Sequence, residues 1–388
     1  MGLPPVLAAT LLTLAAGYLL KLPCVTGPWD GRQYTGLCYS DVMALAGSDG
    51  HVTAAEADKY PVGARYLMDL VAVPASSLAS FFNWTAALWS VLALVTTWAL
   101  WAMTGSGALF FAAAPTLAIY GFMNWDLPLV TLATLGTLAY LRGRNAAAGL
   151  FLGVGGAIKI PYPGILVVPF GAGRVAERRP DDARRILVAA AGAWVVLNFP
   201  VAVATPDRWL EAFRFNAARP ADWDTVWFFL GRHLGFEWPP AVINGIAGVT
   251  FVAAFAAVWW VASRRRPGFP AWTLGLPLIA CYFLTGKVFS PQWTTWLLPW
   301  FALTLPDLRL FVAFEVADVL VFVTRFLWFA ELEGYGGLSI GVFEAALIAR
   351  AAVLVLCVVA WIRRDPPPVA VGPGRRRSRL PLRRPEPA

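Results

Sequence analysis

The chain has 388 residues, of which 59% are hydrophobic and only 14% are charged, and its net charge is +8. Soluble domains carry about a quarter charged residues, so this composition excludes an ordinary soluble enzyme. The aromatic share of 14% excludes a disordered chain, because disordered segments lack the apolar surface that drives burial. The positive charge lies mainly in short segments between apolar runs and near the C-terminus, so we expect no nucleic-acid partner.

Apolar runs of roughly 17–25 residues, each long enough to cross a bilayer, recur along the chain and predict an all-α polytopic membrane protein. About 12 transmembrane helices are expected. The first spans residues 1–20, which lack the positive residues that precede a cleaved signal sequence. The others are expected at residues 81–103, 107–122, 124–141, 145–158, 160–173, 184–203, 241–262, 270–285, 292–305, 310–329 and 338–362.

The arginine residues predict the orientation of these helices. Of the 31 Lys and Arg residues, 19 fall in five segments, at residues 142–144, 174–185, 264–266 and 309 and after Trp361. The twelve-helix arrangement places all five on one side, which the positive-inside rule identifies as the cytoplasm. Both termini then lie in the cytoplasm of a bacterial cell, and the protein is a multi-pass protein of the plasma membrane.

Residues 1–363 are expected to form one transmembrane domain, with large outer loops at 22–80 and 204–240. Within the first loop, residues 62–80 are expected to form a helix along the outer membrane face, because counting them as a crossing would break the charge alternation. Residues 364–388 are rich in Pro and Arg, which predicts a disordered basic cytoplasmic tail near anionic lipid headgroups.

Four cysteines in a chain of this length do not make a disulfide scaffold. Cys24 and Cys38 share the first outer loop, which allows one disulfide if that loop faces an oxidising compartment. Cys281 and Cys357 lie in apolar spans, where we expect them to be inert packing residues.

Two carboxylates stand at expected helix starts near the outer face. Asp41 precedes a short apolar run, which is typical of a helix half sunk in the membrane interface. Asp126 follows Asn124 and Trp125 at the outer end of another helix. Each residue has two interpretations, a simple helix cap or a functional carboxylate.

All four lysines are expected at the outer face: Lys21, Lys59, Lys159 and Lys287. They are either side chains that extend from helix ends to the interface or cations gathered for an anionic ligand. Lys159 and Lys287 each lie in a helix break that contains Gly and Pro. Broken backbone at membrane depth is tolerated only when it is buried in protein or lines a cavity. We therefore predict that these two lysines bind phosphate.

The second outer loop predicts an amphipathic interfacial helix followed by an aromatic segment. Four of its residues face either a polar ligand or the ordinary interface belt of Trp and Arg: Arg214, Asn216, Arg219 and His233. Further along, Glu315, Asp318 and Arg325 lie inside an apolar span. Ionisable groups there are costly and usually paired, so they indicate a structural salt-bridge cluster or a functional pathway.

Several of these segments, taken in order, resemble the GT-C superfamily of polyprenyl-phosphate-sugar-dependent glycosyltransferases, and most closely glycosyltransferase family 87 of actinobacteria. The matching segments are Cys38–Asp41, Tyr60–Pro61, Asn124–Asp126, Gly155–Pro163, Asn198–Pro200 and Lys287–Gln292. The resemblance implies a GT-C-like helical bundle with outer juxtamembrane helices.

The resemblance also implies a reaction. A sugar, mannose first and arabinose second, would pass with inversion from a polyprenyl-phosphate donor to a glycan or glycolipid acceptor outside the membrane. Asp41 would be the general base. Lys159, Lys287 and Arg214 would bind the donor phosphate. The residues expected to contact the sugar or the acceptor are Tyr60, Asp126, His233 and Gln292. With only two histidines, no metal or other cofactor is expected.

Two other classes of function remain open. A secondary transporter or lipid-carrier flippase would use ionisable groups near the membrane midplane, for which Glu315, Asp318 and Arg325 are the candidates. A non-enzymatic relative that scaffolds other cell-envelope enzymes is the other class. The chain shows no internal repeat of the kind found in many transporters, and its large polar outer loops favour the enzyme.

Overall fold

The computed structural model describes residues 1–369, and within them the chain folds into helices without a β-strand. The predicted all-α class is confirmed. Five helical segments in the described range are long and apolar enough to cross a membrane: Leu3–Thr26, Leu78–Ala112, Pro180–Ala204, Pro240–Arg265 and Ile340–Arg363. Most of the predicted basic tail, residues 370–388, lies outside the described residues.

The predicted count of about 12 spanning helices is not confirmed, because many of the apolar segments fold as short or broken helices. Residues 107–122, for example, divide into α7 (Leu109–Ala112) and α8 (Pro115–Tyr120), with Pro115 at the break. The 15-residue helix α9 (Leu127–Leu141) is about 22 Å long at 1.5 Å per residue. A bilayer core is about 30 Å thick.

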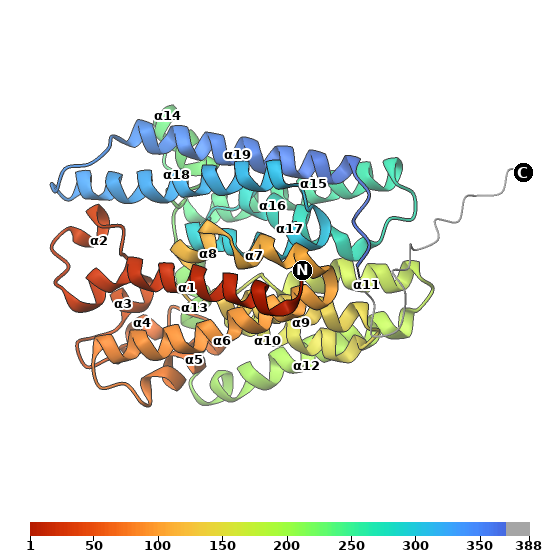
Figure 1. The fold of residues 1–388 in the computed structure, drawn as a ribbon, viewed down its shortest axis with the longest axis horizontal. Coiled ribbons are helices and arrows are strands. Elements are labelled where there is room, and N and C mark those ends of the chain that lie inside the picture. The colour runs from red at the N-terminus through yellow and green to blue at the C-terminus, as the bar shows by residue number, and fades with distance from the viewer. Residues whose placement is uncertain (370–388) are drawn as a thin grey trace, which may run out of the picture.

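The long helices run side by side along one axis of the molecule (Figure 1). They are α1 (Leu3–Thr26), α6 (Leu78–Thr104), α12 (Pro180–Ala204), α15 (Pro240–Arg265), α18 (Leu308–Leu332) and α19 (Ile340–Arg363). Shorter helices complete the bundle: α10 (Asn145–Ile158), α11 (Val167–Ala176), α16 (Gly275–Thr285) and α17 (Leu298–Thr304). Short 3₁₀ helices flank them at η1 (Gly105–Ala108), η2 (Gly164–Leu166), η3 (Ala271–Leu274) and η4 (Pro291–Leu297).

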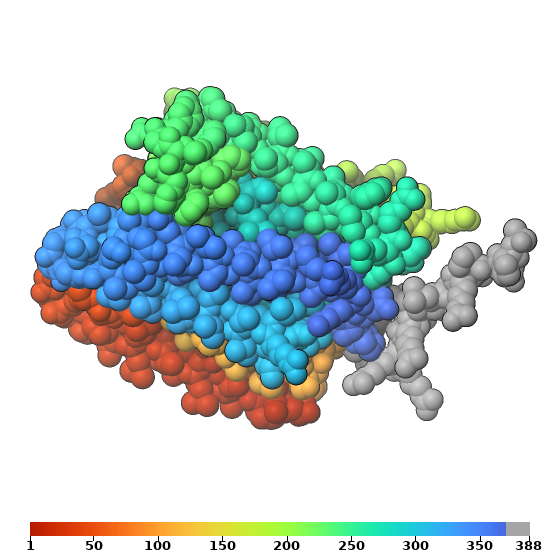
Figure 2. Space-filling model, turned by 90° about the horizontal axis from the view of Figure 1, so that it is seen from above, coloured from red at the N-terminus to blue at the C-terminus, as the bar shows by residue number. Residues whose placement is uncertain are grey.

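Small helices from the two predicted outer loops cluster at one end of the bundle (Figure 1). They are α2 (Arg32–Thr35), α3 (Asp41–Leu45), α4 (Ala54–Ala57), α5 (Val62–Ala72), α13 (Pro206–Ala218) and α14 (Val226–Leu234). In the view of Figure 2, the green segment that contains α13 and α14 rises beside the blue helices α18 and α19. The arginine-rich turn between α11 and α12 and the arginine-rich end of α15 lie at the opposite end of the bundle (Figure 1).

The helix expected over residues 62–80 is shorter than predicted. It ends at Ala72 as α5, and α6 begins at Leu78. The interruption has a local cause, because Ser77 and Ser80 form a reciprocal capping box that starts the new helix. Helix α5 packs against α10 and α12, so this predicted surface helix is part of the bundle end.

Glycines bring α10 and α12 into backbone contact. A Cβ atom on Gly149 would lie 2.1 Å from the Ile186 carbonyl oxygen, and one on Gly153 would lie 2.1 Å from that of Ala190. Only glycine allows so close an approach, which is the usual way that membrane helices pack tightly. The packing fixes the end of α10, where Lys159 follows directly after Ile158.

Candidate active site

A cavity of 820 Å³ lies at the end of the bundle that carries the small helices, and its walls come from both predicted outer loops and both predicted helix breaks. Five residues singled out from the sequence line it: Asp41, Tyr60, Lys159, Lys287 and Gln292. They are spread over more than half of the chain. The fold therefore gathers into one site groups that the sequence presents separately.

The carboxylate of Asp41 is held by three donors. Tyr39 Oη donates to Oδ1 (2.8 Å), while Asn124 Nδ2 (2.5 Å) and Gln292 Nε2 (3.3 Å) donate to Oδ2. The helix-cap interpretation does not describe this geometry, since Ser40 is the N-cap of α3 and no side chain caps that helix. Burial raises the pKa of Asp41 above its ordinary value, although the donors Tyr39 and Asn124 oppose the rise.

The backbone between α8 and α9 positions Asp41. This non-helical segment needs partners for its carbonyl groups. Ser40 Oγ donates to Phe122 O (2.7 Å), the Asp41 amide donates to Met123 O (2.8 Å), and Trp89 Nε1 donates to Asn124 O (3.0 Å). The irregular backbone is thus buried and satisfied, as membrane depth requires, and it delivers the Asn124 amide to the carboxylate of Asp41.

Asp126 forms a buried pair with Lys159. Lys159 Nζ and Trp296 Nε1 each donate to Asp126 Oδ1 at 2.8 Å. Asp126 occupies the N-cap position of α9, as the helix-cap interpretation expects, but its side chain makes no capping hydrogen bond and holds Lys159 instead. The Lys159 ammonium group also lies 5.4 Å from the centre of the Trp293 ring, which is within cation–π range. It lies 5.8 Å from the centre of the Trp296 ring as well, so three side chains hold Lys159 at the cavity.

Lys287 occupies a different position from that expected of a free phosphate ligand. Its Nζ donates to the carbonyl oxygens of Asn216 (2.7 Å), Ala217 (3.2 Å) and Arg219 (2.9 Å). These carbonyls end α13, where helical partners are missing, so all three ammonium protons cap that helix. Burial, helped by the charge of Arg219, lowers the pKa of Lys287 to about 8.

Two of the predicted ligand residues lie elsewhere. Arg214 is on the outer side of α13, where it pairs at 3.4 Å with the exposed Asp207. His233 Nε2 lies 3.3 Å from Glu344 Oε2 of α19. Neither is among the described residues that line the cavity. The prediction that they face the ligand is wrong in its geometry, because helix rotation, which the sequence leaves open, turns them away.

Three other cations line the cavity, Lys59, Arg219 and Arg325. Lys59 Nζ donates to Glu56 Oε1 at 2.7 Å. Arg219 lies over Phe215 at 5.6 Å and near Asp222 at 3.6 Å. The sequence signal for Lys59 was the expected gathering of all lysines at one face. Arg219 is one of the four second-loop residues for which the sequence left open a contact with a polar ligand, and it is at the cavity.

A disulfide joins Cys24 to Cys38, with an Sγ–Sγ distance of 2.05 Å. It links the end of α1 to the residue that precedes Tyr39 and Asp41. Nearby, Lys21 Nζ donates to the Tyr39 carbonyl oxygen (2.8 Å). Both contacts hold the backbone segment that presents the Asp41 carboxylate.

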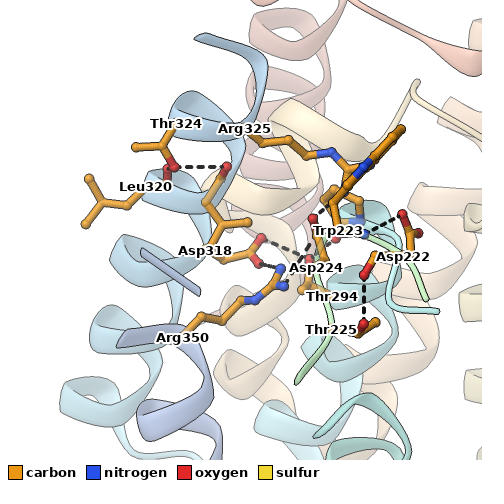
Figure 3. A network of polar contacts seen from close by, with 12 residues as sticks. Asp222, Trp223, Asp224, Thr225, Thr294, Asp318, Leu320, Thr324, Arg325 and Arg350 are labelled. Carbon is orange, nitrogen blue, oxygen red and sulfur yellow. Dashed lines mark hydrogen bonds and ion pairs between the residues drawn. The ribbon is translucent and has the colours of Figure 1, made fainter. Parts of the chain in front are cut away.

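Glu315, Asp318 and Arg325 of α18 do not pair with one another. Arg325 forms an ion pair with Asp224 of the second loop, whereas Asp318 accepts from Arg350 of α19 at 3.1 Å (Figure 3). Glu315 accepts from the amide (2.8 Å) and the hydroxyl (2.9 Å) of Thr116 in α8. All three groups therefore have partners on other elements, which the spacing within α18 could not reveal.

Comparison with known proteins adds one finding. The sequence model of glycosyltransferase family 87 matches residues 65–291, which are more than half of the 388 residues. The matched range includes Asn124, Asp126, Lys159 and Lys287, and it begins after Asp41. A search of curated proteins found no match.

Proposed function

Because the chain belongs to glycosyltransferase family 87, we propose that it moves a sugar from a polyprenyl-phosphate donor to a glycan or glycolipid acceptor on the outer side of a bacterial plasma membrane. We take mannose as the first donor sugar and arabinose as the second. One observation carries the proposal: a carboxylate held by three donors shares a cavity with several cations. The carboxylate suits proton removal, and the cations suit a departing phosphate.

Asp41 is the general base in this proposal. The acceptor hydroxyl attacks the anomeric carbon as its proton passes to an Asp41 carboxylate oxygen, and the bond from that carbon to the phosphate oxygen breaks. One displacement from the opposite face inverts the configuration. A carboxylate with a raised pKa is a stronger base than an ordinary one. The charge of Asp41 raises the pKa of Tyr39. The Tyr39 hydroxyl therefore stays protonated, which supports its role as a hydrogen-bond donor that orients the base.

The leaving lipid phosphate gains negative charge as the bond breaks, and fixed cations in a low-dielectric site stabilise such charge. Lys159 is the best-placed partner, because Asp126 takes only one of the hydrogen bonds that an ammonium group can donate. Lys59 and Arg219 supply further positive charge from the cavity wall. Lys287 acts through its charge alone, since its protons cap α13. Tyr60 and Gln292 remain our assignments for sugar and acceptor contacts. Asp126 is only 2% exposed and lies outside the described cavity lining, so it acts by holding Lys159 and not by contacting the sugar.

The test offers purified protein in lipid a radiolabelled polyprenyl-phosphate mannose together with crude cell-envelope lipids and glycans. We expect label to move to an acceptor with the wild type. Asp41→Asn keeps the side-chain shape and should reduce the rate by about 10²–10⁴-fold, the usual worth of a general base. Its yield and thermal stability should match the wild type.

Each outcome separates one part of the proposal from another. Full activity of Asp41→Asn would remove Asp41 as the base while keeping the transferase. If no mannose is transferred, the assay is repeated with a polyprenyl-phosphate arabinose donor. If neither sugar moves although the donor binds, a lipid-carrier transporter or a scaffold protein becomes the better account.

A further inference from the structure

Trp223 is a large apolar side chain that the fold holds at a cavity surface. It is 42% exposed and lines the same cavity as Asp41, whereas the next residue, Asp224, is only 5% exposed. An exposed tryptophan on a loop is normally free to move. Here the loop is anchored on both sides of the ring, so its position needs an explanation.

The anchor is a chain of buried ions. Asp224 pairs with Arg325 of α18 and lies 3.5 Å from Arg350 of α19, which in turn donates to Asp318 at 3.1 Å (Figure 3). On the other side of the ring, the Asp222 amide donates to Lys287 O at 2.8 Å. Removing four charges from water is costly, and apolar residues would hold a loop as well. The fold therefore fixes Trp223 with more ionic contacts than stability alone requires.

Trp223 ends a continuous aromatic wall that begins at the candidate base. Tyr39, whose hydroxyl bonds to Asp41, lies parallel to Tyr34 with 6.4 Å between ring centres. Tyr34 contacts Phe329 at 5.8 Å, and Phe329 contacts Trp223 at 5.0 Å. These spacings are ordinary for packed aromatic pairs.

One cation belongs to this wall. The Arg325 guanidinium group lies 5.4 Å from the Trp223 ring and 5.2 Å from the Phe329 ring, while its partner Asp224 neutralises its charge. Three further cations line the same cavity. Lys59 and Lys159 come from other elements, whereas Arg219 lies in the same loop as Trp223 and pairs with Asp222. The cavity thus has an aromatic lining beside the Arg325–Asp224 pair, and a set of cations that each have one carboxylate partner. The second suits a phosphate, whereas the first suits a neutral ring that carries hydroxyl groups.

We propose that Trp223, Phe329 and Tyr34 bind a sugar ring of the acceptor, and that the chain Asp224–Arg325–Arg350–Asp318 positions Trp223 for this contact. The inference rests on the proposed function, because it assumes that the cavity receives a carbohydrate acceptor beside Asp41. The carbon-bound hydrogens of a sugar ring form an apolar face that packs on the negative face of an aromatic ring. The Arg325 guanidinium group, which lies over the Trp223 and Phe329 rings, supplies N–H donors for sugar hydroxyls.

The test measures sugar binding separately from catalysis. Water-soluble oligosaccharides released from the cell envelope carry a fluorescent label at the reducing end, and their binding to the purified protein in lipid is followed by anisotropy. Trp223→Ala should weaken binding at least tenfold, and Trp223→Phe should retain more of it. Retention of radiolabelled polyprenyl-phosphate mannose should match the wild type in both variants. Trp260→Ala is the matched control, since Trp260 is 62% exposed and lies outside the described cavity lining.

The inference is overturned if Trp223→Ala binds the oligosaccharides as well as Trp260→Ala does. It is also overturned if the wild type binds none of them, or if Trp223→Ala loses the lipid donor instead, which would place the lipid chain on this wall. Failure of the proposed function looks different: the wild type would bind oligosaccharides through Trp223 and still transfer neither sugar.

Discussion

At the scale of single residues, the state of Asp41 depends on its neighbours. Burial favours the protonated acid, whereas the hydroxyl of Tyr39 and the amide of Asn124 favour the carboxylate. A base in the proposed reaction must be deprotonated when the acceptor binds. The hydrogen bonds from Tyr39 and Asn124 therefore set the lowest pH at which Asp41 is deprotonated and the enzyme is active.

Replacing Tyr39 with Phe tests this balance. The change removes the 2.8 Å hydrogen bond to Asp41 and keeps the ring. Because that bond lowers the pKa of Asp41, its loss should raise the pKa further, and the acid side of the pH–rate profile should move to higher pH. A hydrogen bond to a charged group is worth about 1.5–3 kcal/mol, so the shift should be about one to two pH units.

The matched control is Tyr66→Phe, because Tyr66 lies outside the described cavity lining and its hydroxyl donates to the Leu197 carbonyl oxygen instead of Asp41. Its pH–rate profile should overlay that of the wild type. A Tyr39→Phe profile that overlays the wild type, or moves to lower pH, would contradict the assigned role of the bond.

At the scale of elements, the break between α16 and η4 supports the outer helix α13. Lys287 caps the last carbonyls of α13, and the Lys287 carbonyl accepts from the amide of Asp222. One residue of the break thus holds both the helix that carries Phe215 and the loop that carries Trp223. A lysine expected to serve as a phosphate ligand is also a structural connector.

Lys287→Met should therefore lower stability as well as donor use. Three carbonyl groups lose a charged donor, and we expect a loss of about 1–3 kcal/mol, measured by thermal unfolding of the protein in lipid. The KM for the lipid donor should rise because the cavity loses positive charge. Lys59→Met is the control, since Lys59 lines the cavity and pairs with Glu56 and with the ring of Phe215, but caps no carbonyl of α13 among the described contacts. Lys59→Met should raise the KM for the lipid donor without lowering the unfolding temperature. Equal stability of the two variants would disprove the capping role.

At the scale of the whole molecule, ion pairs between distant segments join the end of the bundle that holds the cavity. Asp224 and Arg325 are 101 residues apart, and Asp318 and Arg350 are 32 residues apart. The pairs connect the second loop, α18 and α19, all of which carry or adjoin the aromatic wall. Breaking a buried pair leaves a charge without compensation, which costs far more than the net contribution of the intact pair.

Asp224→Asn should consequently destabilise the protein by about 3–5 kcal/mol, because Arg325 and Arg350 keep their buried charges. Asp207→Asn removes a carboxylate from the exposed pair with Arg214 and should leave the unfolding temperature unchanged. Thermal unfolding of both variants in the same lipid gives the comparison. An Asp224→Asn variant as stable as Asp207→Asn would show that the buried chain does not hold the loop.

The sequence by itself determined the membrane class, the all-helical fold and the resemblance to family 87. These features depend on local properties, namely hydropathy, helix breakers and short motifs. It also singled out Asp41, Tyr60, Lys159 and Gln292, which share one cavity, because polar groups in apolar surroundings are conspicuous. The number of spanning helices was not settled in this way, since hydropathy does not show where a run such as 107–122 breaks.

Only the tertiary structure decided which groups meet. Asn124 lies 83 residues from Asp41 and Gln292 lies 251 residues from it, and no spacing rule connects them. The rotation of α13 turned Arg214 away and left Arg219 at the cavity. Arg325 pairs with Asp224 of the second loop and not with a carboxylate of its own helix. A hydrogen bond requires its atoms to approach within about 3 Å, and such an approach depends on how whole helices pack, which local sequence does not encode.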